Sequence, residues 1–323
     1  MACKTCHRFF ELFAYSYCGL HVLSKIAFPE LPQSKHDKGW LLFSLEPPIN
    51  HSIQPIWLHH WLSQSGDKLL SYCIQDSYHW LRFPGLADFR ISANAREISC
   101  RPLPEIPQET LRHLFLDQVL PRCLAHRGRI MLHASAVQLE QGLLLCIGDS
   151  GAGKSTLAGI FHQAGSPVMS DDCVWVKKNK DQIRAVPSYG GLRLWEDSLQ
   201  VLFSAEQNIQ SMAHYSTKKR VPLNENDMLG FGSGIPILAV IVLSPLGQSP
   251  DQEVILDRLS HREAFIAMMK QTFQLNLMDL ERMTRHMQAL GRIVPRLLAF
   301  RLSMPRDYDL LPIVRQKILE IVL

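Results

Sequence analysis

A glycine-rich stretch in the middle of the chain combines residue types and spacing that suit phosphate binding. It reads Gly148-Asp149-Ser150-Gly151-Ala152-Gly153-Lys154-Ser155 and fits the pattern G-x-x-x-x-G-K-[ST] without a mismatch. In this pattern the glycines let the backbone turn, so that successive N–H groups face the phosphates of a nucleotide. Lys154 reaches the β- and γ-phosphates, and the Ser155 hydroxyl is a ligand for Mg²⁺. The stretch, with Thr156 directly after it, therefore predicts a site for ATP and Mg²⁺.

The residues on either side place this loop between a strand and a helix. Residues 143–147 are a short apolar run typical of a buried strand, and residues 156–164 have helical spacing that stops at Gly165. A helix that begins at the loop adds the positive end of its dipole to a phosphate site. The alternative, a glycine-rich turn that contains Gly-Lys-Ser by chance, is disfavoured by both flanks.

Two adjacent carboxylates, Asp171 and Asp172, lie a short distance further along the chain. They follow residues 167–169, a short predicted strand that returns to the sheet edge near the loop. Phosphoryl transfer needs one carboxylate that holds Mg²⁺ and one acceptor for the proton of the attacking hydroxyl. Neighbouring side chains at a strand end diverge, so the pair can meet both needs; the alternative is a solvated turn. His133 is a third candidate, although a single histidine in a strand is usually structural.

Residues 1–104 are predicted to form a small, mostly β domain. Short alternating or apolar runs are separated by segments rich in turn-forming residues. The predicted strands are 20–27, 40–45, 56–62, 69–74, 78–83 and 89–91. Four of the six tryptophans fall in this domain, which leaves two interpretations. One is a docking surface for an acceptor, and the other is core packing, the commoner use of aromatic residues on half-buried strands.

Residues 105–323 are predicted to form an α/β domain that contains the loop. A strand over 129–137 and its partner over 143–147 enclose a tight turn and lead into the loop. The other predicted strands are a hairpin around 179–181, a central strand at 237–244 and a strand at 297–302. The predicted helices are 109–124, 156–164, 260–273, 278–291 ending at Gly291, and a terminal helix capped by Asp309.

The composition excludes several classes of protein. The chain has 323 residues, 46% of them hydrophobic and 20% charged, which is ordinary for globular proteins. A net charge of +4 and a single short basic run, Lys218-Lys219-Arg220, do not indicate a nucleic-acid partner. No apolar stretch has the length of a membrane span. Eight scattered cysteines without a secretory signal favour reduced thiols, so we expect a cytoplasmic protein.

The phosphate loop, His133 and Asp171-Asp172 together resemble the HPr kinase/phosphorylase family in order and spacing. The resemblance covers about residues 129–176. It implies a P-loop kinase domain related to phosphoenolpyruvate carboxykinase. In that family's terms, Asp171 is the general base that takes the proton of a serine, and Asp172 and Ser155 are Mg²⁺ partners. His133 is a polar catalytic-site residue, and Lys154 clamps the phosphates.

Residues 187–197 differ from the glycine-containing signature that follows the aspartate pair in the family. With the extra N-terminal domain, they are more similar to divergent HPr kinase-related proteins, some of which phosphorylate lasso-peptide precursors. The resemblance implies ATP- and Mg²⁺-dependent phosphorylation of a serine on a peptide or small protein, with a homo-oligomer as an option. The basic run around Lys218 would suit a cationic element that closes on the γ-phosphate, or it is a solvated surface.

Two other functions fit the same motifs. One is a kinase of a free small molecule such as serine, and the extra β domain mildly disfavours it because a metabolite kinase has less need of a docking surface. The other is a nucleotide-binding sensor without transfer chemistry. Asp171, Asp172 and Lys154 argue against the sensor, because a site used only for binding has no need of a base.

Overall fold

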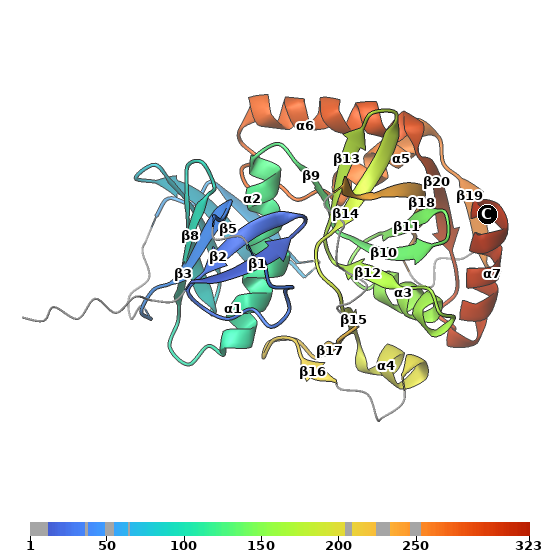
Figure 1. The fold of residues 1–323 in the computed structure, drawn as a ribbon, viewed down its shortest axis with the longest axis horizontal. Helices are drawn as coiled ribbons and strands as arrows, with labels where there is room; N and C mark the ends of the chain where they lie inside the picture. The colour runs from blue at the N-terminus through green and yellow to red at the C-terminus, as the bar shows by residue number, and fades with distance from the viewer. Residues whose placement is uncertain are drawn as a thin grey trace, which may run out of the picture. The chain divides into compact units, whose positions relative to one another are not determined.

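The structure, a computed structural model, describes residues 12–35, 38–48, 55–63, 65–203, 209–223, 233–245 and 253–323. The chain divides into two compact units, Met1–Pro104 and Glu105–Leu323 (Figure 1). The chain contains both α-helices and β-strands, and the strands form several sheets. Within the described ranges, none of the helices combines the length and the apolar character needed to cross a membrane.

The first unit is built on an eight-stranded sheet with the order β1-β2-β3-β8-β7-β6-β5-β4. Its pairs are antiparallel except β2–β3 and β3–β8, which are parallel. Alternate residues of the strands point into a core that includes Phe43, Leu81 and Phe89. The strands are β1 (Phe13–Tyr17), β2 (Leu20–Ser24), β3 (Leu41–Leu45), β4 (His59–Leu62), β5 (Lys68–Gln75), β6 (Tyr78–Phe83), β7 (Ala87–Ser92) and β8 (Glu97–Pro102).

Two of these strands, β1 and β8, were not predicted. β8 pairs with β7 as far as Pro102, opposite Ala87. A proline is tolerated at a strand end, yet in the sequence Pro102 and Pro104 are typical of a linker. The alternation of β8 is also weak, because Ser99 and Cys100 are both buried.

The second unit is built on a nine-stranded mixed sheet. Its main path has the order β12-β10-β11-β18-β14-β13-β9, and β20 joins β18 and β19 beside it. β18 lies parallel to both β11 and β20, at the centre of the sheet. The strands are β9 (Ile130–Leu132), β10 (Ala134–Leu139), β11 (Gly142–Ile147), β12 (Val168–Asp171), β13 (Val174–Asn179), β14 (Gln182–Pro187), β18 (Ile235–Leu243), β19 (Ile255–Arg258) and β20 (Leu298–Ser303).

Helices cover both faces of this sheet, because alternate residues of β11 and β18 point to opposite sides (Figure 1). Leu144 and Ile241 pack with Phe161 of α3 (Lys154–Gln163) and with α7 (Leu311–Val322). On the other side, Leu145 packs with α5 (His261–Lys270) and α6 (Leu280–Ile293). The near-continuous apolar sequences of β11 and β18 follow from burial on both faces.

The predicted strand over 129–137 is two strands, broken at His133. β9 pairs with β13, whereas β10 pairs with β11 and β12. At the break, the N–H of His133 donates to the carbonyl of Gln271 instead of to a strand of the sheet. The apolar sequence gives no sign of this change of partners, which turns His133 out of the ladder.

The predicted helix over 109–124 contains a π-helical segment. It runs as α1 (Gln108–Leu114), η1 (Phe115–Val119) and α2 (Leu120–His126). Pro121 has no N–H to bond the carbonyl of Asp117, so the regular α-helical pattern cannot continue there. Asp117 lies in this segment, and its side chain is buried.

The predicted start of the helix at Ser260 is confirmed, whereas several predicted helix boundaries differ from the structure, and α5, predicted to reach residue 273, ends at Lys270. The capping box of Ser260 and Glu263 is present at the start of α5. α6 does not end at Gly291 but continues to Ile293. The cap near the C-terminus is Asp307, which accepts from the N–H of Asp309 in a short 3-10 helix, η6 (Tyr308–Leu310), before α7 begins. Aspartates two residues apart make such a cap hard to assign from sequence.

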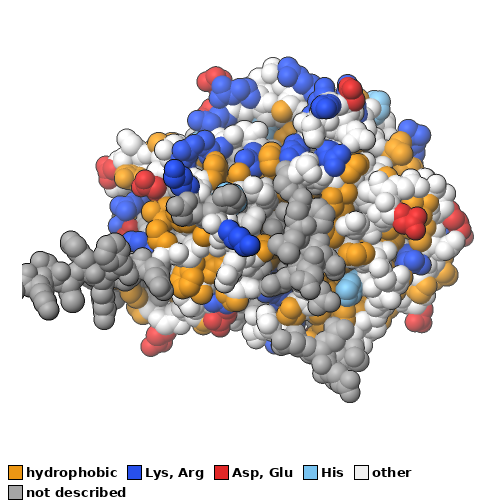
Figure 2. All heavy atoms as spheres, in the orientation of Figure 1, with side chains coloured by type: hydrophobic (Ala, Val, Ile, Leu, Met, Phe, Trp, Pro, Cys, Tyr) orange, Lys and Arg blue, Asp and Glu red, His pale blue; other side chains and the backbone are white. Residues whose placement is uncertain are grey.

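α6 is amphipathic. His286, Leu290 and Ile293 face the core at helical spacing, whereas Arg282, Arg285 and Arg292 are exposed. Figure 2 shows basic side chains along this helix. His286 is the exception on the inner face, since its Nε2 is buried and has no hydrogen-bond partner within the described ranges.

We expect His286 to make the protein sensitive to mild acid. Burial lowers the pKa of His286 below its ordinary value, so the folded state resists a proton that the unfolded chain accepts. Stability is therefore lost as the pH falls through about 6.5, the ordinary histidine pKa. His286→Leu should reduce the drop in Tm between pH 7 and pH 5, whereas the exposed His261→Leu should not. An equal drop in wild type and His286→Leu would contradict this.

Candidate active site

The phosphate loop joins β11 to α3, as the sequence predicts (Figure 1). Gly151 and Gly153 have φ of 83° and 95°, in the left-handed region that favours glycine. A Cβ at Gly151 would meet no atom within 4 Å, so the backbone there borders open space. The loop therefore presents its backbone to a ligand without a side chain in the way. Ala152 is buried in the core below it.

Lys154 folds back over the loop. Its Nζ donates to the carbonyl oxygens of Gly148 at 2.8 Å and Asp149 at 3.1 Å. Burial lowers the pKa of Lys154 below its ordinary value, although Asp172 and Asp171 oppose that change. The ammonium group of Lys154 therefore lies at the loop, and the negative charges of both aspartates stabilise its positive charge.

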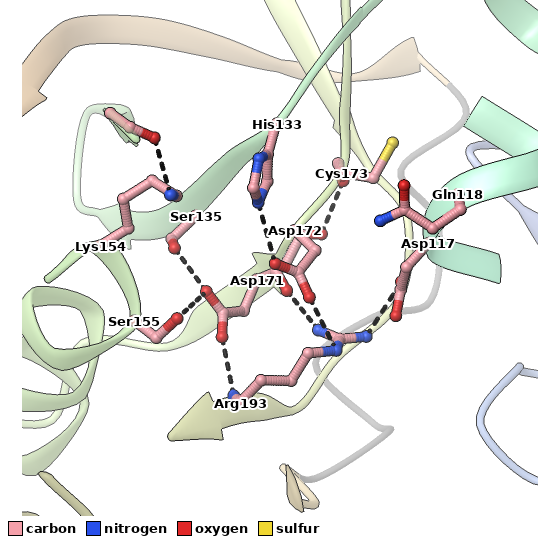
Figure 3. A network of polar contacts seen from close by, with 12 residues as sticks. Asp117, Gln118, His133, Ser135, Lys154, Ser155, Asp171, Asp172, Cys173 and Arg193 are labelled. Atoms are coloured by element: carbon pink, nitrogen blue, oxygen red, sulfur yellow. Dashed lines mark hydrogen bonds and ion pairs between the residues drawn. The ribbon is translucent and has the colours of Figure 1, made fainter. Parts of the chain in front are cut away.

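Asp171 ends β12 and is 1% exposed. Its Oδ1 accepts from Ser135 Oγ at 2.5 Å and from Ser155 Oγ at 2.9 Å, and its Oδ2 accepts from the N–H of Arg193 at 2.8 Å (Figure 3). Burial, together with the neighbouring Asp172 carboxylate, raises the pKa of Asp171. Asp171 is therefore the buried member of the pair, with both oxygens already engaged.

Asp172 is the more accessible member, with a side chain that is 17% exposed. Its Oδ1 lies 3.2 Å from His133 Nε2, and its Oδ2 lies 2.9 Å from Arg193 Nε (Figure 3). Burial by itself would raise the pKa of Asp172, but Arg193 and then His133 outweigh it and hold the pKa well below its ordinary range. Asp172 also has a φ of 148°, a conformation that costs a non-glycine residue about 1–3 kcal/mol.

His133 completes this side of the site. The break between β9 and β10 directs its ring toward Asp172, and its side chain remains 34% exposed. The ring also lies 6.1 Å from that of Phe273. His133 is thus a partner of a carboxylate at the open side of the site and not a core residue.

Sequence reasoning missed Arg193, which is central to the site. Arg193 lies in β15 (Leu192–Leu194) and is 2% exposed. Besides its contacts with Asp171 and Asp172, it pairs with Asp117 Oδ1 at 3.3 Å. In the sequence, Arg193 lies within residues 187–197, a segment that indicates no chemical role for it, so only the pairing of distant segments shows its place.

The structure brings together Lys154, Ser155, Asp171, Asp172 and His133, but it pairs the aspartates differently from the sequence-based expectation. Ser155 contacts Asp171, not Asp172, and His133 contacts Asp172. The reason is the strand pairing, which sets Asp171 in β12 opposite Ser135 of β10. Thr156 points to α4 (Glu196–Leu202), where its Oγ1 lies 2.9 Å from Ser198 Oγ.

A small three-stranded sheet places the basic run beside the site. β15 pairs with β17 (Lys219–Val221), which also pairs with β16 (Gln210–Ser211). Lys218, just before β17, has its Nζ 5.2 Å from the ring centroid of Trp195. The positive charge of Lys218 helps to lower the pKa of both Asp172 and Lys154. The proposed closure of this run on a γ-phosphate stays a prediction.

The residues of the site fit ATP with Mg²⁺. The donor set around the loop is made of oxygen atoms, which Mg²⁺ prefers. Ser155 Oγ and Asp171 Oδ1 are 2.9 Å apart, and neighbouring ligands of an octahedral Mg²⁺ at about 2.1 Å are separated by roughly 3 Å. The open backbone at Gly151 and the positively charged Lys154 suit phosphate oxygens.

Comparisons with known proteins show a distant likeness to solved structures. No protein-family model matches the chain, and no curated protein matches it. Among solved structures, the chain is similar to the Hpr(Ser) kinase/phosphatase from Coxiella burnetii. The match has 12% identity and a TM-score of 0.31, and it covers 59% of this chain and 97% of that one. This similarity is too low to support a function.

Proposed function

We propose that the protein is an ATP- and Mg²⁺-dependent kinase that phosphorylates a serine hydroxyl of a peptide or small protein. The observation that supports it is the convergence of two differently held carboxylates on the phosphate loop. Asp171 lies against Ser155 of the loop, and Asp172 lies beside His133 at the open side. A site that only binds nucleotide needs no second, accessible carboxylate, whereas phosphoryl transfer to a hydroxyl does.

The loop binds and orients the nucleotide in this proposal. Bound Mg-ATP would supply the phosphoryl group to be transferred and a cation that screens its charge. Lys154 would exchange its contacts with the loop carbonyls for phosphate oxygens, and the backbone around Gly151, which borders open space, would leave room for the same oxygens. Ser155 and Asp171 are the residues that would hold the cation.

Asp172 is the proposed proton acceptor. The sequence assigned this role to Asp171 and cation binding to Asp172, and the contacts favour the reverse. Asp171 is 1% exposed and has both oxygens engaged by Ser135, Ser155 and the N–H of Arg193, whereas Asp172 is the more accessible carboxylate. Asp172 is partly exposed, and each of its oxygens has one charged or polar partner. Arg193 and His133 lower its pKa, which keeps the carboxylate ionised but makes it a weaker base than an ordinary aspartate. His133 would orient it and share the proton that it receives.

Lys154→Ala tests the nucleotide site. Removing a charged hydrogen-bond donor costs about 1.5–3 kcal/mol, so the affinity for ATP should fall by roughly 10- to 150-fold. Isothermal titration calorimetry with Mg-ATP measures the change directly. Lys178→Ala, which removes an exposed lysine of β13, is the matched control and should bind as wild type does. No detectable ATP binding by the wild type would overturn the proposed function.

A further inference from the structure

We propose that Arg193 is a positioning residue that fixes the direction of the Asp172 carboxylate for the transfer step. The inference rests on the proposed function and goes beyond it by giving the reaction a further residue. Arg193 is buried and holds three separate acceptors of the pair (Figure 3). Its Nε pairs with Asp172 Oδ2 at 2.9 Å, its N–H donates to Asp171 Oδ2 at 2.8 Å, and one Nη donates to the carbonyl oxygen of Asp171.

The guanidinium group makes contacts on both sides of the strained backbone at Asp172. It bonds the carbonyl before Asp172 and the carboxylate of Asp172 itself, and between them lies the φ of 148°. An unfavourable conformation persists only where the surroundings over-determine it. The N–H of Asp172 adds a third restraint by donating to the carbonyl of Ala134. Arg193 thus holds Asp172 in a direction that its own backbone does not favour.

A second set of contacts fixes Arg193 on its far side. Its other Nη lies 3.3 Å from Asp117 Oδ1, and its guanidinium lies over the ring of Tyr189 at 4.7 Å. The Tyr189 hydroxyl donates to Asp117 Oδ1 at 2.5 Å, and His113 Nδ1 lies 2.7 Å from Asp117 Oδ2. The π-helical segment η1 thereby contributes to the site through Asp117. The planar guanidinium group has several N–H donors that point in different directions, so arginine can bond acceptors on two sides at once, whereas the single ammonium group of lysine cannot.

Four variants test the inference: Arg193→Met, Arg193→Lys, Asp172→Asn and the double variant Arg193→Met/Asp172→Asn. The readouts are ADP formation from Mg-ATP with water as acceptor, the KM for ATP, and Tm. We expect Arg193→Met to lower kcat about 100-fold with a KM within about threefold of wild type. Arg193→Lys should recover Tm more than kcat. Because Arg193 acts through Asp172, the double variant should be no slower than the slower single one.

Arg82→Met is the control for the loss of an arginine paired with a buried aspartate; the Arg82 side chain is 18% exposed. Arg82 makes two hydrogen bonds of 2.7 Å to Asp88 in the first unit. This variant should lower Tm without changing kcat per folded molecule. A kcat of Arg193→Met that matches wild type, a kcat of Arg193→Lys that recovers in step with Tm, or additive losses in the double variant would overturn the positioning role. A wild type that binds no Mg-ATP would instead overturn the proposed function and, with it, this inference.

Discussion

Asp172→Asn is expected to lower the turnover of Mg-ATP by about 10²–10⁴-fold, the usual contribution of a positioned general base. An amide cannot accept the proton of the attacking hydroxyl, and it offers Arg193 and His133 a neutral partner in place of an anion. Asp172 contacts His133 and Arg193, whereas Ser155 contacts Asp171, so the affinity for Mg-ATP should stay within a few-fold of wild type. Steady-state kinetics give kcat, and isothermal titration calorimetry gives the affinity.

The informative result is whether Asp172→Asn changes kcat and the affinity for Mg-ATP separately or together. An interaction used only in the transition state lowers kcat and leaves binding unchanged. A variant that keeps its kcat would contradict the assignment of Asp172 as the proton acceptor. A variant that loses kcat and affinity together would place Asp172 at the cation.

Asp171→Asn is expected to remove most of the benefit of Mg²⁺. The amide keeps nearly the same shape beside Ser135 and Ser155 but loses the charge that attracts the cation. Metal ions stabilise this kind of transition state by several kcal/mol, and each 1.4 kcal/mol is about tenfold in rate, so turnover should fall by roughly 10²–10³-fold. Titration of ATP with and without Mg²⁺ should show a gain in affinity for wild type and Asp172→Asn but little gain for Asp171→Asn.

The two variants together decide how the pair divides its work. If Asp171→Asn keeps the full gain in affinity from Mg²⁺ and loses turnover, Asp171 is the base, as the sequence-based expectation had it. Binding in EDTA provides the control, because the loop alone should bind ATP equally in both variants.

The loop could be predicted from the sequence because its chemistry depends on a continuous stretch. Gly151, Gly153 and Lys154 act through local backbone shape and through the strand and helix on either side. The capping box at Ser260 is local in the same way. Each of these features is written within a few residues, so no knowledge of the tertiary structure was needed.

The division of the aspartate pair could not be predicted, because it depends on strand pairing between distant segments. Which carboxylate reaches Ser155 is set by the register of β12 against β10. Which one faces His133 is set by the break between β9 and β10, inside a run of apolar residues.

Arg193 and Asp117 were missed for a related reason. Arg193 meets the pair through the position of β15, and Asp117 meets Arg193 through a π-helical segment caused by Pro121. A lone charged residue in an apolar or amphipathic run is usually assigned to the surface. Buried ion pairs of this kind become visible only when both partners are placed.

The most direct test of the proposed kinase is phosphoryl transfer from Mg-ATP to candidate acceptors. Peptides encoded beside this gene and free serine are incubated in parallel with the wild type and with Asp172→Asn, and the products are identified by mass spectrometry. We predict a peptide phosphorylated on serine that the wild type forms and Asp172→Asn does not. Phosphoserine alone would make the protein a small-molecule kinase, and ATP binding without either product would contradict transfer chemistry and favour a nucleotide sensor.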